Sequence, residues 1–289
     1  YAPDRRFSYS NTNYVLLALI VEQVAGISFA DYLTRNIFEP LEMKHTQVYG
    51  QRHFKNKIDN YADGYIYNGI KDKYVFNDST ERYQYFFDGV VGPYGISSTA
   101  GDLLKWDQAL YTEKLVNKQE LKNAFAPYIL TDNKPAKMMG LLYGFGWLIN
   151  EPQKFHLHTG GYPGYATLII RYVEKNQTVI VLMNNYGRIN MYELGYNIEN
   201  ILNNRSFSIP SVKKYPNVIP LSNESLVKFI GEYQHKDSPQ FKIWITHKDN
   251  QLFAQLTGQR SIEIYPEAKN TFFYTAVDAK IVFTRDSTD

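Results

Sequence analysis

The first forty residues carry apolar side chains at helical spacing. From Asn13 to Ala25 these positions are Leu16, Leu19, Ile20 and Val24, and Gly26 follows as a C-terminal stop. Ser28, with Asp31 three residues later, is typical of a capping box and predicts a second helix that ends before Pro40. The pattern therefore predicts a chain that begins with two helices.

The middle of the chain changes from helical spacing to strand-like segments. Residues 50–92 are polar, aromatic and without a clear period, which predicts a long loop-rich excursion beside a cleft. A second capping pattern, Thr99 to Asp102, opens an amphipathic helix with one apolar stripe. Segments rich in β-branched and aromatic residues then predict strands at 144–149, 165–172 and 178–183, and a closing helix at 197–202.

The last third of the chain reads differently. Residues 205–220 contain three prolines and are typical of a linker. A short helix at 223–229 is predicted next, followed by six strands at 232–235, 241–247, 252–256, 261–265, 271–275 and 280–284. Asp249-Asn250 favours a tight hairpin between the second and third of these strands. Such short, evenly spaced strands predict a small antiparallel sheet or barrel.

Length and charge exclude several classes of function. A chain of 289 residues suggests two domains, at about 150 residues per domain. The net charge is +2, from 31 basic and 29 acidic side chains, which argues against nucleic acid or an anionic membrane as partner. The longest aliphatic stretch, Val15 to Val21, is far below the roughly 18 residues of a membrane span. Without cysteine there are no disulfides, thiolate metal sites or Cys nucleophile.

Tyr9 and Asn11 are the first candidates for chemistry. A tyrosine with its reference pKa of about 10 is a poor base at neutral pH, so it needs nearby cations to deprotonate a serine hydroxyl. Asn11 offers a neutral amide that can accept from a lysine ammonium and donate to a substrate carbonyl. The alternative is an ordinary helix entry with Asn11 as its cap, in a chain that contains 25 tyrosines.

The segment His158-Thr159-Gly160-Gly161 is the second candidate. It combines a basic side chain, a small hydroxyl and two glycines that let the backbone approach a substrate, and a glycine N–H there can form half of an oxyanion hole. The alternative is a glycine-rich strand entry with a surface histidine. His156 is expected on the same strand face as His158, but no third zinc ligand has a sensible spacing, so no metal or other cofactor is predicted.

Several other residues resemble functional groups without being expected to act as such. Two Ser-x-x-Lys matches, Ser211 to Lys214 and Ser225 to Lys228, fall where no buried nucleophile helix is expected, and we interpret both as chance matches. Four acidic residues are expected to be helix caps or to lie on solvated faces: Glu22, Asp88, Asp102 and Asp107.

Five segments of the chain carry a resemblance to a known family: residues 7–14, 40–46, 95–103, 143–147 and 158–164. In this order they resemble the serine hydrolases of the β-lactamase and penicillin-binding-protein superfamily, in its class C, D-aminopeptidase and esterase branch. Each is weak alone, but the ordered set is specific. The resemblance implies an α/β (α+β) β-lactamase-like fold, with an antiparallel sheet flanked by helices, a helical subdomain and then a small antiparallel β-barrel domain.

The resemblance also implies domains and roles. It implies a hydrolase domain at 1–205 without its nucleophile segment, a linker at 206–220 and a lipocalin-like β domain at 221–289. Tyr9 would be the general base, Asn11 would steady a lysine and the substrate amide, His158 would be the basic group of the third motif, and the Gly161 N–H would belong to the oxyanion hole. The remaining residues expected to contact substrate are Thr159, Gly160 and Tyr162.

The expected reaction is acyl transfer to a serine and then to water, on an ester, a D-amino-acid peptide or a β-lactam, without a cofactor. The family often has lysine at the place of His158, and a mostly neutral histidine holds a β-lactam carboxylate less firmly, which favours the ester or peptide. Small-molecule or peptide substrates are the expected partners. An extracytoplasmic location follows from the resemblance only.

The Ser-x-x-Lys nucleophile of the family does not precede Tyr9 in this sequence. We therefore expect a truncated chain, a separate N-terminal fragment that carries the nucleophile, or a degenerate homologue, and no turnover by this chain alone. Two alternatives stay open: a non-catalytic binding or scaffold homologue of penicillin-binding proteins, and a lipid or peptide carrier that works through the C-terminal β domain.

Overall fold

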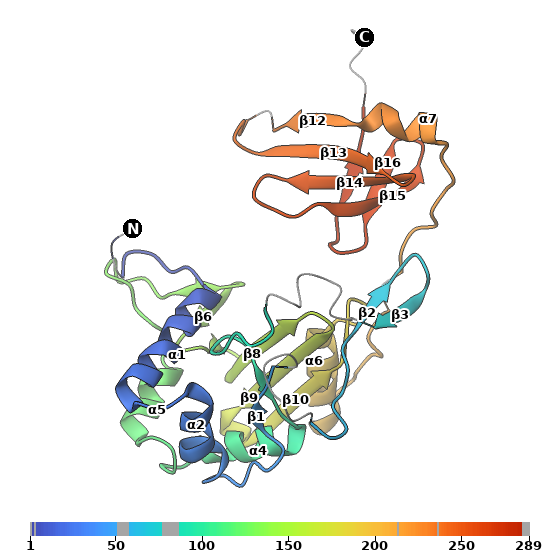
Figure 1. Cartoon of the computed structure of the whole chain (residues 1–289). Coiled ribbons are helices and arrows are strands. Elements are labelled where there is room, and N and C mark those ends of the chain that lie inside the picture. The colour runs from blue at the N-terminus through green and yellow to red at the C-terminus, as the bar shows by residue number, and fades with distance from the viewer. Residues whose placement is uncertain are drawn as a thin grey trace. The chain divides into compact units, whose positions relative to one another are not determined.

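The computed structural model describes residues 2, 4–50, 58–76, 87–212, 214–235 and 237–284, and the structural statements below concern these residues. The chain forms two compact units, Tyr1–Ile66 with Phe76–Ser211 and Tyr67–Val75 with Val212–Asp289 (Figure 1). No single helix in the described part of the chain is long and apolar enough to cross a membrane. One helix pair, Asn11–Ala25 with Phe29–Phe38, has sufficient length and apolar composition when taken together, but it is bent by 79°.

The two predicted N-terminal helices are confirmed. Helix α1 (Asn11–Ala25) ends at Gly26, whose left-handed φ of 69° lets its N–H donate to the Glu22 carbonyl. Helix α2 (Phe29–Leu33) starts on the predicted cap, where the Asp31 N–H donates to Ser28 Oγ at 3.0 Å, and continues as a π-helix, η1 (Thr34–Phe38). The chain leaves this helical segment before Pro40, as the steric restriction ahead of proline predicts.

The first unit is built on a six-stranded antiparallel sheet with the order β10-β9-β8-β7-β6-β5. Its strands are β5 (Lys137–Met138), β6 (Leu141–Tyr143), β7 (Leu148–Asn150), β8 (Phe155–Tyr162), β9 (Tyr165–Tyr172) and β10 (Gln177–Met183). On one face, Leu168 and Ile170 pack under Gly195 of α6 (Met191–Leu202). On the other face, Arg171 meets Asp107 of α4 (Ala100–Ala109). Helices therefore cover both faces, as predicted for this fold class.

Two predicted elements of this unit need correction. The predicted strand 144–149 is wrong at its start, because residues 144–147 form the turn between β6 and β7. Gly146 has a φ of 81°, and a Cβ on Gly144 would lie 2.7 Å from two carbonyl oxygens. The closing helix begins at Met191 rather than at 197, because the Asn190 side chain accepts from the N–H groups of Tyr192 and Glu193 and caps it there.

Smaller elements complete the first unit. They are β1 (Gln47–Val48) paired with β4 (Ile96–Ser97), α5 (Lys118–Phe125), η2 (Val173–Lys175) and β11 (Asn185–Tyr186), which runs parallel to β2 (Tyr65–Asn68). The predicted excursion at 50–92 contains β2 and its neighbour β3 (Lys73–Phe76). Residues 51–57 and 77–86 of that prediction lie outside the described residues.

The second unit is an antiparallel meander, as predicted. A short helix, α7 (Asn223–Leu226) with η3 (Val227–Phe229), precedes six strands in sequence order: β12 (Gly231–Gln234), β13 (Lys242–Lys248), β14 (Gln251–Leu256), β15 (Ile262–Ala268), β16 (Thr271–Tyr274) and β17 (Lys280–Val282). Asp249 and Asn250 have φ values of 51° and 59°, which fits the predicted tight hairpin. The Phe283 ring lies 5.3 Å from the Tyr233 ring of β12, so the sheet curls back on its start.

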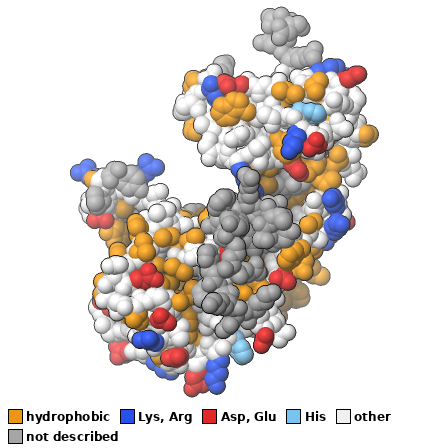
Figure 2. Space-filling view, in the orientation of Figure 1, with side chains coloured by type: hydrophobic (Ala, Val, Ile, Leu, Met, Phe, Trp, Pro, Cys, Tyr) orange, Lys and Arg blue, Asp and Glu red, His pale blue; other side chains and the backbone are white. Residues whose placement is uncertain are grey.

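Much of α1 is apolar surface. Ala18 is its buried residue, whereas five apolar side chains are about half exposed or more: Leu16, Leu17, Leu19, Ile20 and Val24. Figure 2 shows apolar side chains gathered on this side of the first unit. Apolar patches of this kind are typical of contact surfaces.

Candidate active site

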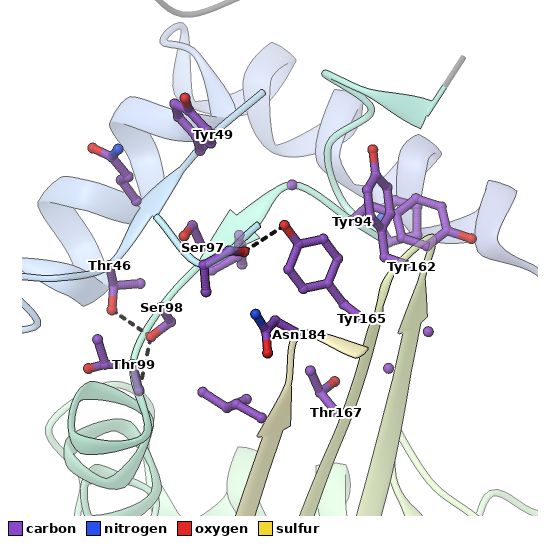
Figure 3. Close-up of a pocket in the computed structure, with 18 of the residues that line it drawn as sticks. Thr46, Tyr49, Tyr94, Ser97, Ser98, Thr99, Tyr162, Tyr165, Thr167 and Asn184 are labelled. Atoms are coloured by element: carbon purple, nitrogen blue, oxygen red, sulfur yellow. Dashed lines mark hydrogen bonds between the residues drawn. The ribbon is translucent and has the colours of Figure 1, made fainter. Parts of the chain in front are cut away.

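All seven residues predicted for the site line one cleft of about 1170 Å³ in the first unit. Tyr9 and Asn11 come from the start of α1, and the other five are consecutive at the end of β8: His158, Thr159, Gly160, Gly161 and Tyr162. The opposite wall comes from the chain around β1 and β4 (Figure 3). The fold therefore brings the two distant sequence motifs into one cavity.

A hydrogen-bonded chain orients the polar atoms at the start of α1. Tyr9 OH donates to Asn11 Oδ1 at 2.9 Å, and Asn11 Nδ2 donates to Tyr94 OH at 2.7 Å. Ser10, not Asn11, is the N-cap of α1, and it makes no side-chain capping bond. The alternative of Asn11 as an ordinary cap is therefore wrong, because its amide is used across the cleft instead.

The Tyr9 ring lies among aromatic side chains next to His158. Its ring centroid is 6.2 Å from that of His158 and 6.3 Å from that of Tyr143, whose hydroxyl lies 3.2 Å from Tyr14 OH. Burial, with smaller contributions from Tyr14 and Tyr94, raises the pKa of Tyr9. These surroundings keep the phenol protonated, so a role as base needs a cation beside it.

His158 is held as a neutral ring. Burial lowers its pKa, and the bond between Nδ1 and the Thr159 carbonyl at 2.8 Å opposes that shift only in part. A ring that is neutral at pH 7 can hydrogen-bond a substrate but carries no fixed positive charge.

The two positions after Thr159, Gly160 and Gly161, differ in how much room a side chain would have. A Cβ on Gly160 would lie 2.2 Å from Thr167 Oγ1, so that position excludes side chains. A Cβ on Gly161 would meet nothing within 4 Å. Gly161 thus leaves open space on the cleft wall, where a substrate can approach the backbone.

Sequence reasoning missed the hydroxyl-rich wall opposite β8. Thr46 Oγ1 lies 2.7 Å from Ser98 Oγ and donates to the Asp102 carboxylate at 3.0 Å, and Asp102 also accepts from the His45 N–H. Burial alone would raise the pKa of Asp102, but the hydrogen bonds from Lys105, His45 and Thr46 outweigh it and hold the pKa below its usual value. The signal was present, because 40–46 and 95–103 were two of the matched segments.

The prediction that Asp102 and Asp107 are caps or solvated residues is wrong. Asp102 is 2% exposed and Asp107 is 0% exposed. Asp107 forms an ion pair with the buried Arg171 guanidinium and accepts from Thr178 Oγ1 at 2.7 Å. Buried carboxylates of this kind need partners supplied by distant strands, which spacing along the helix does not reveal. Glu22, by contrast, does cap a helix, because its Oε1 accepts from the Phe29 N–H at 2.8 Å.

The remaining candidates lie apart from this chemistry. Neither Ser211 nor Ser225 lines the cleft, and Ser225 is part of α7, where its N–H donates to Ser222 Oγ. His156 stacks on Phe125 with ring centroids 4.9 Å apart. In the described part of the chain, no group of three or more His, Asp or Glu side chains is arranged to hold a metal.

The chain is similar to several known proteins. Penicillin-binding protein 4* of Bacillus subtilis is 32% identical over 291 residues, which cover 98% of this chain and 63% of that protein. The octameric penicillin-binding protein homologue from Pyrococcus abyssi has a TM-score of 0.60 at 24% identity, over 94% of this chain and 59% of that one. The penicillin-binding protein from Bacillus halodurans has a TM-score of 0.58 at 24% identity, over 70% of this chain and 57% of that one.

The chain thus spans about three fifths of the length of these relatives. The two solved structures, at 24% identity, support the fold, and a family model described as beta-lactamase matches residues 1–196, which is well over half of the chain. The chain therefore belongs to the β-lactamase family, the serine hydrolases that include the penicillin-binding proteins.

Proposed function

We propose that the full-length protein is an acyl-serine hydrolase for which this chain supplies the general base, the third-motif histidine and part of the oxyanion hole. The single observation that carries the proposal is the position of Tyr9 and His158. Their rings lie 6.2 Å apart in one cleft, although the sequence separates them by most of the first unit.

In the proposed mechanism, Tyr9 takes the proton of the attacking serine hydroxyl. Because the surroundings raise the pKa of Tyr9, the lysine of a Ser-x-x-Lys pair is needed beside it to favour the phenolate. Once Tyr9 is a phenolate it no longer donates to Asn11 Oδ1, so that oxygen would accept from the ammonium while the bond from Nδ2 to Tyr94 OH holds the amide. The backbone N–H of Gly161 would stabilise the oxyanion of the tetrahedral intermediate.

The nucleophile in this proposal belongs to a part of the full-length protein outside residues 1–289. Two observations support that source. The serines of both Ser-x-x-Lys matches lie away from the cleft lining, and the exposed apolar side chains of α1 are suited to packing against a further segment.

The proposed substrate is an ester or a D-amino-acid peptide rather than a β-lactam. The neutral His158 supports this choice, because it lacks the fixed charge that would hold a carboxylate beside the reacting carbonyl. Hydrolysis of β-lactams would then be the slower reaction.

The test is labelling of the full-length protein by a fluorescent fluorophosphonate, which phosphonylates an activated serine with loss of fluoride, and the modified residue is identified by mass spectrometry. We expect one labelled serine and a loss of roughly 10²- to 10⁴-fold in ester hydrolysis for Tyr9→Phe. Tyr186→Phe is a matched control, because Tyr186 is exposed and does not line the cleft. Unlabelled but folded protein would favour the scaffold alternative, and full activity of Tyr9→Phe would refute the assigned base.

A further inference from the structure

A continuous row of tyrosine rings follows the cleft away from Tyr9. The ring centroids are 5.7 Å apart for Tyr94 and Tyr162, 6.2 Å for Tyr162 and Tyr165, 6.4 Å for Tyr165 and Tyr61, and 5.3 Å for Tyr61 and Tyr49. All five side chains line the cleft and are half-buried. Figure 3 shows Tyr165 between Tyr49 on one side and Tyr94 with Tyr162 on the other. We call these five residues the tyrosine row.

The tyrosine row is assembled from separate parts of the chain. Tyr162 and Tyr165 face each other across the hairpin between β8 and β9, whereas Tyr49 follows β1 and Tyr94 precedes β4. The backbone is shaped to admit the central ring, since a Cβ on Gly64 would lie 2.7 Å from the Tyr165 ring. Tyr165 OH also donates to the Ala62 carbonyl at 2.8 Å, which holds the ring in place.

The tyrosine row presents neutral aromatic surface. Burial raises the pKa of both Tyr61 and Tyr165, so these phenols stay protonated at any physiological pH. Asp59, Asp88 and Lys44 line the same cleft, so its charged lining carries two carboxylates against one ammonium, which gives an anionic ligand no net attraction. Aromatic rings attract one another at centroid separations of 4.5–7 Å, in tilted or edge-to-face arrangements like those within the row.

The inner end of the tyrosine row touches the candidate active site. Tyr94 OH accepts from Asn11 Nδ2 at 2.7 Å, and Asn11 in turn accepts from Tyr9 OH. A ligand group bound along the tyrosine row therefore lies in the same cleft as Tyr9 and Asn11.

We propose that the tyrosine row is a binding subsite for an uncharged aryl group of the substrate. The use of this subsite in catalysis rests on the proposed function. Binding of an aryl group to the subsite does not, because an aryl ligand without a reactive carbonyl can occupy it. Aryl substrates are thereby selected over aliphatic ones of the same size.

The test measures binding of benzyl methyl sulfone to the full-length protein by ligand-observed NMR, with cyclohexylmethyl methyl sulfone as the non-aromatic match. Neither sulfone can be acylated, so the result does not depend on turnover. We expect the aryl sulfone to bind more tightly, and Tyr61→Leu to weaken its binding roughly three- to tenfold. The affinity for the aryl sulfone should be unchanged in two controls. These are Tyr61→Phe, which keeps the ring, and Tyr186→Leu, which lies outside the cleft lining.

A second measurement uses the protein without any substitution. In protein with isotope-labelled tyrosine, the phenyl protons of the bound sulfone should give intermolecular NOEs to tyrosine ring protons. Equal affinity for the two sulfones, or an absence of such NOEs, would overturn the subsite. Aryl binding without serine labelling would instead overturn the proposed function and leave the subsite intact.

Discussion

His156 and His158 stand two residues apart on the same face of β8, yet they lie in two different kinds of surroundings. His156 stacks on Phe125 at 4.9 Å with the rings parallel within 1°, beside the buried pair of Arg171 and Asp107. Burial and the nearby Arg171 charge lower its pKa to about 4. His158 lies at the cleft, next to Tyr9, with Nδ1 bonded to a backbone carbonyl.

The comparison shows that residue type and strand position do not decide what a histidine does here. Around His156, the Arg171 guanidinium lies 4.8 Å from the Phe125 and Tyr111 rings, and this cluster fills the space between the sheet and its covering helices. Around His158, glycines and the start of α1 leave an open cavity. The first region is packed around a buried ion pair, and the second leaves the open cavity in which we propose the reaction.

The largest effect on the first region is expected from Asp107→Asn. It leaves the Arg171 charge buried without its counter-ion, which should lower the free energy of unfolding by about 3–5 kcal/mol in urea denaturation. Asp132→Asn, at a pair with both side chains exposed, should leave stability unchanged. Equal stability of the two variants would mean that the buried pair does not hold the first region together.

The second effect is the pH dependence of stability that His156 confers. Its folded-state pKa, about 4, lies below the unfolded value of 6.5, so as the pH falls from 6.5 to 4 the unfolded state takes up a proton that the folded state refuses. This contribution is fully present well above pH 6.5, and roughly 1–2 kcal/mol is lost by pH 4 once the partial solvent exposure of the ring is taken into account. His156→Phe should flatten this part of the curve of unfolding free energy against pH, and an unchanged curve would contradict the assigned cause.

The third effect concerns the cleft around His158 and tests whether Tyr94 positions Asn11. Tyr94→Phe removes the acceptor of Asn11 Nδ2 and should lower kcat of the full-length enzyme about five- to tenfold, with KM little changed. Tyr186→Phe removes a tyrosine hydroxyl outside the cleft lining, keeps the bond between Asn11 and Tyr94, and serves as the control. If both variants lower kcat equally, the hydrogen bond to Asn11 is not the reason.

The smallest effect is expected from His158→Lys. An ammonium next to Tyr9 favours the phenolate, so the pKa of Tyr9 should fall and the pH–rate profile should move to lower pH. Carboxylate-bearing esters should gain roughly two- to fivefold in kcat/KM relative to neutral ones. An unchanged ratio between the two ester types would show that residue 158 does not contact the substrate carboxylate.

Local patterns predicted much of the fold. The caps at Ser28 and Thr99, the glycine stop at Gly26 and the Asp249-Asn250 hairpin are short-range features, and the structure has all four. The strand at 165–172 and the C-terminal meander also follow from alternation and composition. The turn at 144–147 could not be predicted, because a Cβ on Gly144 would meet the carbonyls of Ala124 and Ala126 from another segment of the chain.

By itself, the sequence determined the elements, the antiparallel second sheet and the residue types of the site, because capping, turn chemistry and side-chain period act within a few residues. Tertiary structure alone decided that Asn11 bonds Tyr94 across the cleft, that Asp107 is buried against Arg171, and that five tyrosines form one row. These arrangements join atoms far apart in the chain. Their energies come from burial and from partners that only the folded packing brings within reach.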